Sequence, residues 1–189
     1  MRIISGTAKG TKLYTLEGLE TRPTLDRVKE SLFNIIFNEI KESTVLDLFS
    51  GSGAIGLEFA SRGAKKVYLC DKSKSACEII KKNIEKTHLE KNVELINMDF
   101  IKAIQELKKI KVDIIYLDPP YKTDFIKIAI EELEKTEIIA DNSLLIAETD
   151  EKDKITKQIE NIKGIEIVDV RKYGRAYILF LKKTNRKEE

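Results

Sequence analysis

The segment Val45–Gly56 constrains the fold more than any other part of the sequence. A short apolar run is followed by a turn with the spacing Gly51-x-Gly53-x-x-Gly56 and then by a helical pattern. Glycines allow backbone N–H groups to approach a ligand closely at the start of a helix. The order of strand, tight turn and helix therefore predicts a nucleotide-binding element. Within it, we expect Gly56 to serve helix packing rather than ligand contact.

Strand and helix patterns alternate through the rest of the chain. Apolar runs predict strands at 45–48, 66–70, 93–97, 112–117, 143–148, 165–171 and 176–181, and helical spacing predicts helices at 54–62, 73–87, 100–108, 123–135 and 152–162. Such repetition is typical of a parallel sheet with helices on both faces. The loop 172–175 is too short for a crossover helix, so the last two strands must pair antiparallel. The expected fold class is a doubly wound α/β protein with a mostly parallel seven-stranded sheet and an antiparallel last strand.

The N-terminal part has a different pattern. Residues 2–16 predict two short strands around a turn at Lys9-Gly10, and residues 25–40 predict one amphipathic helix with Thr24 as its N-cap. We therefore divide the chain into an N-terminal hairpin and helix at 1–40 and a larger domain at 41–189.

Composition and charge limit the protein classes. The 189 residues are 42% hydrophobic and 35% charged, which is typical of a globular protein, and no apolar run approaches the roughly 18 residues of a membrane span. Cys70, Cys77 and the single histidine, His88, match no disulfide framework and no metal-site spacing, so we expect a cytoplasmic protein without a metal. The net charge is only +2, but both ends of the chain are basic, which suits a polyanionic partner at one face.

Acidic residues follow several of the predicted strands. Asp47 lies within the first strand, Asp71 follows the second and Asp99 follows the third. Because ligands of open parallel sheets bind beyond the carboxyl ends of the strands, these acids should surround one ligand with several donors. Asp71 lies twenty residues after Gly51, the place of a carboxylate that binds ribose hydroxyls. Asp47 should either orient the loop or meet a cationic group, and Asp99 could accept a hydrogen bond from an adenine amine.

The sequence Asp118-Pro119-Pro120-Tyr121 is the most specific signal. Two prolines after a buried strand remove two backbone donors and stiffen the loop. The remaining groups are acceptors, followed by an aromatic ring that can stack on a base for roughly 1–3 kcal/mol. This combination suits a planar ring that carries an exocyclic amine.

These motifs, in this order, resemble the class I S-adenosylmethionine-dependent methyltransferases that modify exocyclic amines. The N-terminal residues, above all Arg22-Pro-Thr-x-Asp-Arg-Val-Lys-Glu-Ser-Leu-Phe-Asn34, further resemble the bacterial RsmD family, which methylates the N2 amine of a guanine in 16S ribosomal RNA. The resemblance implies that S-adenosylmethionine binds at Asp47, Phe49, Ser50, Gly51, Gly53, Asp71, Lys72, Asp99 and Phe100. It also implies a catalytic set of Asp118, Pro119, Pro120 and Tyr121.

The same resemblance, together with the charge distribution, indicates which residues bind RNA. We expect contacts to ribosomal RNA, free or in a small ribosomal subunit, from Arg2, Lys9, Lys12, Arg22, Thr24, Arg171 and Arg175. Three alternatives remain open at this point: a nicotinamide-dependent oxidoreductase, a DNA adenine-N6 methyltransferase, and a non-catalytic RNA-binding module. The oxidoreductase leaves the Asp118 tetrapeptide unexplained. We expect a monomer that does not bind membranes.

Overall fold

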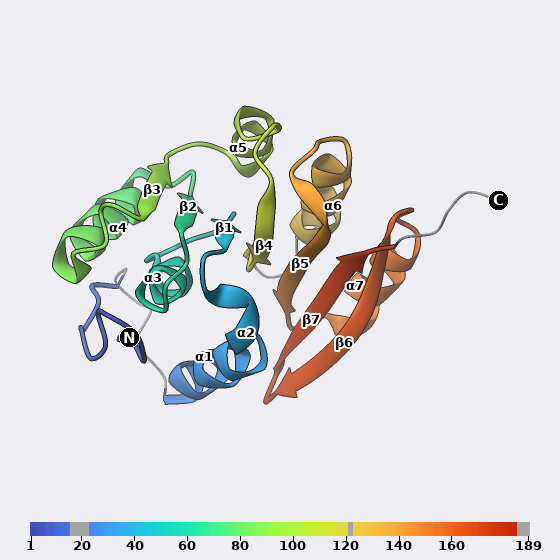
Figure 1. Ribbon diagram of the computed structural model, residues 1–189. Coiled ribbons are helices and arrows are strands. Elements are labelled where there is room, and N and C mark those ends of the chain that lie inside the picture. The colour runs from blue at the N-terminus through green and yellow to red at the C-terminus, as the bar shows by residue number, and fades with distance from the viewer. Residues whose placement is uncertain (16–22, 121–122, 185–189) are drawn as a thin grey trace. The chain divides into compact units, whose positions relative to one another are not determined.

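A computed structural model describes residues 1–15, 23–120 and 123–184 of the chain (Figure 1). Contacts divide the protein into two compact units, Met1–Asp99 and Phe100–Glu189, and each unit is described by itself.

The first unit contains three parallel strands: β1 (Thr44–Asp47), β2 (Lys66–Cys70) and β3 (Val93–Ile96), in the order β3-β2-β1. They are short and rich in β-branched and aliphatic residues, as expected of parallel strands buried between layers. Helices α3 (Ala54–Ser61) and α4 (Lys74–Thr87) pack on this sheet through buried side chains such as Leu57 and Ile80. Together, these elements place the carboxyl ends of β1, β2 and β3 at one edge.

Local sequence signals set the bounds of α4. The Ser73 hydroxyl accepts a hydrogen bond from the Ala76 N–H at 3.3 Å and caps the helix start. His88 ends the helix in a left-handed conformation, with φ of 56°. The prediction of a helix at 73–87 is therefore confirmed to within one residue. The sole histidine serves as a helix C-cap.

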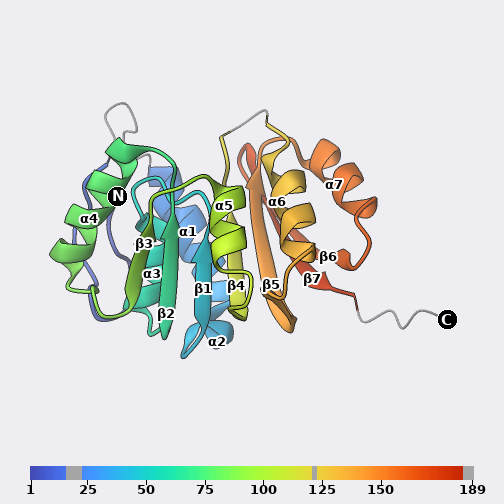
Figure 2. The same ribbon diagram turned by 90° about the horizontal axis from the view of Figure 1, so that it is seen from above.

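The second unit contains four strands in the order β4-β5-β7-β6: β4 (Val112–Leu117), β5 (Ile139–Thr149), β6 (Ile165–Tyr173) and β7 (Ala176–Lys183). β4 and β5 are parallel, whereas β7 is antiparallel to both of its neighbours. The helices are α5 (Phe100–Glu106), α6 (Phe125–Glu134) and α7 (Lys152–Glu160), and α6 and α7 lie side by side (Figure 2). The seven strands thus form the mixed, mostly parallel sheet that the sequence predicts, with the last strand antiparallel.

The N-terminal part differs in detail from the prediction. The expected antiparallel hairpin is present, but it has a single bridge between Arg2 and Lys12 and forms no strands. The predicted helix at 25–40 is two helices, α1 (Pro23–Ile35) and α2 (Phe37–Ile40). Since α1 begins at Pro23, Thr24 lies inside its first turn, and its prediction as an N-cap is wrong. Proline at the first helical position has a preset φ and lacks an N–H that would be unpaired there.

The packing role predicted for Gly56 is confirmed. A Cβ at this position would lie 2.0 Å from Leu69 Cδ2 and 3.2 Å from Val67 Cγ1, both on β2. The absence of a side chain therefore allows α3 to approach the sheet closely. This approach fixes where α3 begins, and with it the glycine turn that precedes the helix.

We expect Gly56→Ala to lower the free energy of unfolding by about 1–3 kcal/mol, because the added methyl overpacks the interface between α3 and β2. Chemical denaturation measures the change. The matched test is the Gly56→Ala/Leu69→Ala double variant, in which the clash is relieved and the two single effects should not add. If the double variant loses as much stability as the two single variants together, this explanation is contradicted.

Candidate active site

The glycine turn lies between β1 and α3 and is held by the chain around it. The Ser50 N–H donates to the Cys70 carbonyl at 2.9 Å, the Ser50 hydroxyl donates to the Asp47 carbonyl at 2.9 Å, and the Gly53 N–H donates to the Ser50 carbonyl at 2.7 Å. Gly51 and Gly53 have φ of 56° and 79°, a left-handed conformation that favours glycine. A Cβ on Gly51 would meet no atom within 4 Å, so the turn presents bare backbone to open space.

Asp71 joins this turn to the end of β2. Its Oδ2 accepts a hydrogen bond from the Gly51 N–H at 2.9 Å, and its Oδ1 accepts one from the Ser73 N–H at 2.8 Å. The Asp71 carbonyl accepts a third bond, from Asn97 Nδ2, at 2.9 Å. The structure therefore brings together the glycine turn and the acid twenty residues later. Each carboxylate oxygen keeps lone pairs for a further donor.

Asp47 is the most unusual group of the first unit. Its side chain is 1% exposed, and neither carboxylate oxygen has a hydrogen-bond partner in the described part of the chain. Burial raises the pKa of Asp47 to about 7. Nearby polar groups of Phe49, Ser50 and Gly56 offset part of this rise, although none of them reaches good hydrogen-bond geometry with the carboxylate. A buried acid without partners is costly, so this position suits a ligand that brings a cation or N–H donors.

The other residues predicted to bind the cofactor lie at or next to strand ends. Lys72 is exposed and follows Asp71, and Phe49 is half-buried in the glycine turn. Asp99 is half-buried and closes the first unit, whereas Phe100 opens α5 in the second unit. The Phe100 ring is buried, with its centroid 5.3 Å from that of Phe125.

The acceptor-rich turn follows β4 in the second unit. Asp118 is half-buried, Pro119 is buried and Pro120 is exposed. The Pro120 carbonyl accepts a hydrogen bond from Thr123 Oγ1 at 2.9 Å, which fixes the loop before α6. Tyr121, the predicted stacking residue, lies outside the described residues. The turn from 118 to 120 offers carboxylate and carbonyl oxygens but, with two prolines, only one backbone N–H.

Buried polar contacts hold the N-terminal segment, Met1–Tyr14, against the first unit. Glu58, which is 0% exposed, accepts hydrogen bonds from the N–H groups of Ile4 and Ser5 at 2.8 and 2.9 Å. The same carboxylate pairs with Lys29 at 3.1 Å and Arg62 at 2.7 Å. Three basic groups predicted to bind RNA are carried on this segment and are exposed: Arg2, Lys9 and Lys12.

A second anchor connects this segment directly to the glycine turn. The side chain of Asn83 on α4 is buried, accepts from the Tyr14 N–H at 2.8 Å and donates to the carbonyls of Tyr14 at 3.0 Å and Ser52 at 2.9 Å. One amide therefore fixes both the end of the segment and the middle of the turn. Arg22 lies outside the described residues, and so does the side chain of Thr24.

The remaining basic residues lie on the last hairpin of the second unit. Arg171 on β6 and Arg175 in the turn are both exposed, and Arg171 pairs with Asp169 at 2.7 Å. They are thus carried by a different unit from Arg2, Lys9 and Lys12.

Comparison with known proteins identifies the family. The family model described as conserved hypothetical protein 95 matches residues 1–182. Ribosomal RNA small subunit methyltransferase D of Haemophilus influenzae is 39% identical over 82% of this chain and 80% of its own length. The Escherichia coli protein of the same name is 33% identical over 79% and 75%. The chain belongs to the RsmD family.

A solved structure agrees with this assignment. The structure of the E. coli protein yhhF has a TM-score of 0.83 and 27% identity, and the match covers 98% of this chain and 99% of that one. Both the resemblance to the RsmD family and the fold class that the sequence predicts are therefore confirmed. No described helix is both long and apolar enough to cross a membrane.

Three polar residues of this RsmD-family protein were missed in the sequence: Glu58, Asn83 and Glu148. Glu58 and Asn83 each interrupt the apolar face of a helix, which is the signal that could have found them. Glu148 is half-buried near the end of β5 and accepts a hydrogen bond from the Tyr116 hydroxyl at 2.7 Å. Its signal is an acid directly after the apolar run 144–147, the same pattern that singled out the other strand-end acids.

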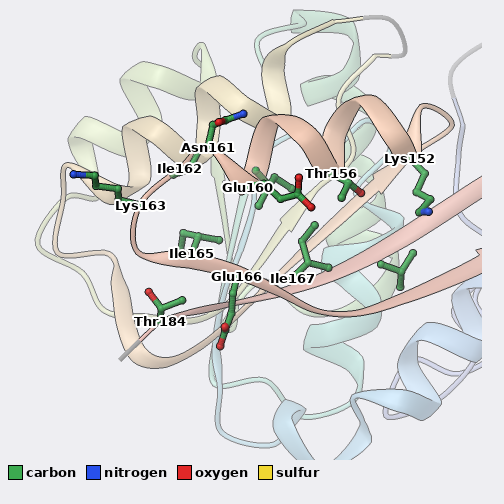
Figure 3. A pocket seen from close by; sticks show the side chains of 12 residues that line it. Lys152, Thr156, Glu160, Asn161, Ile162, Lys163, Ile165, Glu166, Ile167 and Thr184 are labelled. Atoms are coloured by element: carbon green, nitrogen blue, oxygen red, sulfur yellow. The ribbon is translucent and has the colours of Figure 1, made fainter. Parts of the chain in front are cut away.

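The second unit also contains a cavity that does not belong to this site. Figure 3 shows it between α7 and β6, with a volume of about 440 Å³. None of the residues predicted for the cofactor, the guanine or the RNA lines it.

Proposed function

We propose that this RsmD-family protein transfers a methyl group from S-adenosylmethionine to the exocyclic N2 amine of a guanine in small-subunit ribosomal RNA. The observation that carries the proposal is the acceptor-rich turn Asp118-Pro119-Pro120 at the end of β4, in a chain whose relatives are named as ribosomal RNA methyltransferases. An exocyclic amine has two N–H donors, and this turn offers the acceptors that it needs.

The residues of the first unit fit the cofactor, which supplies an electrophilic methyl group on a sulfonium. Asp47 is a buried carboxylate without a partner among the described residues, and the cofactor's methionine part carries an ammonium group. Gly51 leaves room for close approach of that part, alongside Phe49 and Ser50, whereas Gly53 packs against Leu69 and Ile80 and would contribute its left-handed backbone to the turn. Asp71, with Lys72 beside it, would hold the ribose hydroxyls, and Asp99 with the Phe100 N–H would hold the adenine.

The second unit would contribute to catalysis mainly by positioning the guanine amine. A guanine amine is a weak nucleophile because its lone pair is delocalised into the ring. Acceptors at Asp118 and Pro119 would hold both amine hydrogens and direct the lone pair at the methyl group. Alignment of this kind can supply roughly 7–11 kcal/mol of barrier reduction in favourable cases. Tyr121 would stack on the base, and the proton lost from nitrogen would pass to Asp118 or to water.

The basic surfaces would bind the phosphates. We assign Arg2, Lys9, Lys12, Arg22 and Thr24 of the 1–40 extension to the RNA-facing side, together with Arg171 and Arg175. A target base must be unstacked before it reaches the turn after β4, at a cost of a few kcal/mol. Phosphate contacts would offset that cost. We further propose a cytoplasmic monomer that acts on ribosomal RNA, either free or within a small ribosomal subunit.

The proposal is tested with ribosomal RNA from a strain that lacks the gene. Purified protein and tritiated S-adenosylmethionine are incubated with free RNA and, separately, with small-subunit particles, and the labelled nucleotide is mapped. We expect label at one guanine of the small-subunit RNA in at least one of the two substrates. Label on an adenine, or no transfer together with tight NADH binding, would contradict the proposal.

Salt dependence tests the proposed RNA contacts of the N-terminal segment. We expect Lys9→Ala/Lys12→Ala to raise KM for RNA by about tenfold and to reduce the slope of log K against log salt by about 1.4, or 0.7 for each lost contact. The matched control is Lys108→Ala/Lys109→Ala, which removes two exposed lysines elsewhere. Equal effects of the two double variants would contradict a specific role for this segment.

A further inference from the structure

A carboxylate that the proposed function does not use lies next to the acceptor-rich turn. β4 and β5 are parallel, with Tyr116 opposite Ile146 and Leu117 opposite Ala147. The pairing stops there because β4 ends at Leu117, and Asp118 and Glu148 are the residues that follow the last pair. Side chains alternate along a strand, so Glu148 lies on the face that Ile146 and its partner Tyr116 share, next to the turn that begins at Asp118.

Glu148 is held in place but is not neutralised. The Tyr116 hydroxyl donates to Glu148 Oε2 at 2.7 Å, and the Tyr116 side chain is itself buried. Across residues 1–15, 23–120 and 123–184, no lysine or arginine forms an ion pair with Glu148, and Tyr116 is the one donor to its carboxylate. Burial raises the pKa of Glu148, and the hydrogen bond from Tyr116 offsets part of that rise.

A half-buried acid that has one donor and no cation is suited to bind a ligand. A carboxylate can accept about four hydrogen bonds, so Oε1 and the second lone pair of Oε2 remain available for donors from a ligand. A purely structural Tyr116–Glu148 contact would not require a charge, since a glutamine could accept the same hydrogen bond. The position of Glu148 beside Asp118 limits the ligand to whatever lies at the acceptor-rich turn.

We infer that Glu148 accepts a hydrogen bond from the N1–H of the target guanine and thereby selects guanine over adenine. This inference rests on the proposed function. Guanine presents two neighbouring kinds of donor on one edge, its N1–H and its N2 amine, which match acceptors from Glu148 and Asp118. Adenine presents a bare N1 acceptor next to its amine, and that lone pair would face the carboxylate of Glu148. The hydrogen bond from the Tyr116 hydroxyl to Oε2 fixes the orientation of the carboxylate. Oε1 then accepts the hydrogen bond from the guanine N1–H.

The test uses 2-aminopurine, which keeps the exocyclic amine on C2 but has no proton on N1. RNA with guanine or 2-aminopurine at the methylated position is compared in the form that the wild-type protein methylates. We expect the wild type to prefer guanine in kcat/KM by about 10²-fold or more, since a site built for a donor rejects an analogue that lacks it. Glu148→Gln should reduce this preference to tenfold or less, because an amide can accept from guanine N1–H or donate to the bare N1.

The ratio between two RNAs measured on one variant cancels general losses of stability or cofactor affinity. An unchanged ratio in Glu148→Gln, or a wild type that methylates both RNAs equally, would overturn the inference while leaving the proposed function standing. A wild type that methylates no guanine would overturn the proposed function and the inference with it. Glu166→Gln, at an exposed position on β6, is the matched control and should keep the full preference.

A second variant keeps the inference testable if Glu148→Gln does not fold. Tyr116→Phe retains the carboxylate and removes only the hydroxyl that orients it. We expect the preference for guanine to fall by several-fold, with cofactor affinity unchanged by calorimetry. An unchanged preference in Tyr116→Phe would show that orientation of Glu148 has no part in recognition and would contradict the inference.

Discussion

Asp118→Ala should lower kcat for methyl transfer by about 10²–10³-fold, the usual effect of removing one preorganised polar group from a reacting centre. Asp118 would lose its role as acceptor for the N2 amine and with it the alignment of the nitrogen lone pair. Affinity for S-adenosylmethionine should stay within about twofold of the wild type, since our proposal assigns the cofactor's main contacts to the first unit. Single-turnover methyl transfer measures the first quantity and calorimetry measures the second.

The matched control for this prediction is Asp113→Ala. Asp113 lies on the same strand, β4, and is exposed. The control should retain nearly full activity. If Asp118→Ala transfers methyl groups at a near-normal rate with cofactor bound, the role assigned to the turn after β4 is wrong.

Asp47→Asn should stabilise the protein without cofactor and weaken cofactor binding. The pKa of Asp47 is raised from 3.8 to about 7 because the carboxylate is buried. The folded protein therefore binds more protons than the unfolded chain in this range, so Asp47 lowers stability as the pH rises from 3.8 to about 7. The full effect at pH 8 would be up to roughly 4 kcal/mol, and a buried amide keeps part of the cost, so we expect a gain of roughly 1–3 kcal/mol.

Chemical denaturation of wild type and Asp47→Asn at several pH values measures this gain, which should shrink towards pH 4. The variant should also lose about 10–100-fold in affinity for S-adenosylmethionine, since a hydrogen bond to a charged group contributes about 1.5–3 kcal/mol. At pH 6.5, cofactor binding should release a proton from the wild type and none from the variant. Asp153→Asn, at an exposed position on α7, is the control. A gain in stability that is independent of pH would contradict the assignment.

Much of the fold could be predicted because its signals are local. The apolar run before Gly51, the Ser73 cap and the short loop before Ala176 each specify their structure within a few residues. The packing role of Gly56 also followed from the strand–turn–helix pattern. The errors lie where the deciding interactions are distant in sequence. The two arms of the N-terminal hairpin do bond to each other, as from the Ile3 N–H to the Thr11 carbonyl, but the N–H groups of residues 4, 5 and 8 bond to side chains of α3, so the arms form one bridge and no strands.

The site divides in the same way. The partnership of Gly51 and Asp71 could be predicted, because both follow neighbouring strands of a parallel sheet. The lack of hydrogen-bond partners for the Asp47 carboxylate among the described residues could not be predicted, because it depends on what surrounds the side chain in three dimensions. Asn83 was missed for a related reason: a helix pattern shows that it lies on the buried face of α4 but not that it reaches Tyr14 and Ser52.

The identity of the methylated nucleoside distinguishes methyl transfer to guanine N2 from transfer to any other base or ring position. Small-subunit ribosomal RNA from a strain lacking the gene is treated with the protein and S-adenosylmethionine, digested to nucleosides and analysed by mass spectrometry against standards. We expect N2-methylguanosine, about one per RNA molecule, and an initial rate of its formation about 10²–10³-fold lower with Asp118→Ala. Formation of N6-methyladenosine or of a ring-nitrogen methylguanosine instead would contradict our account.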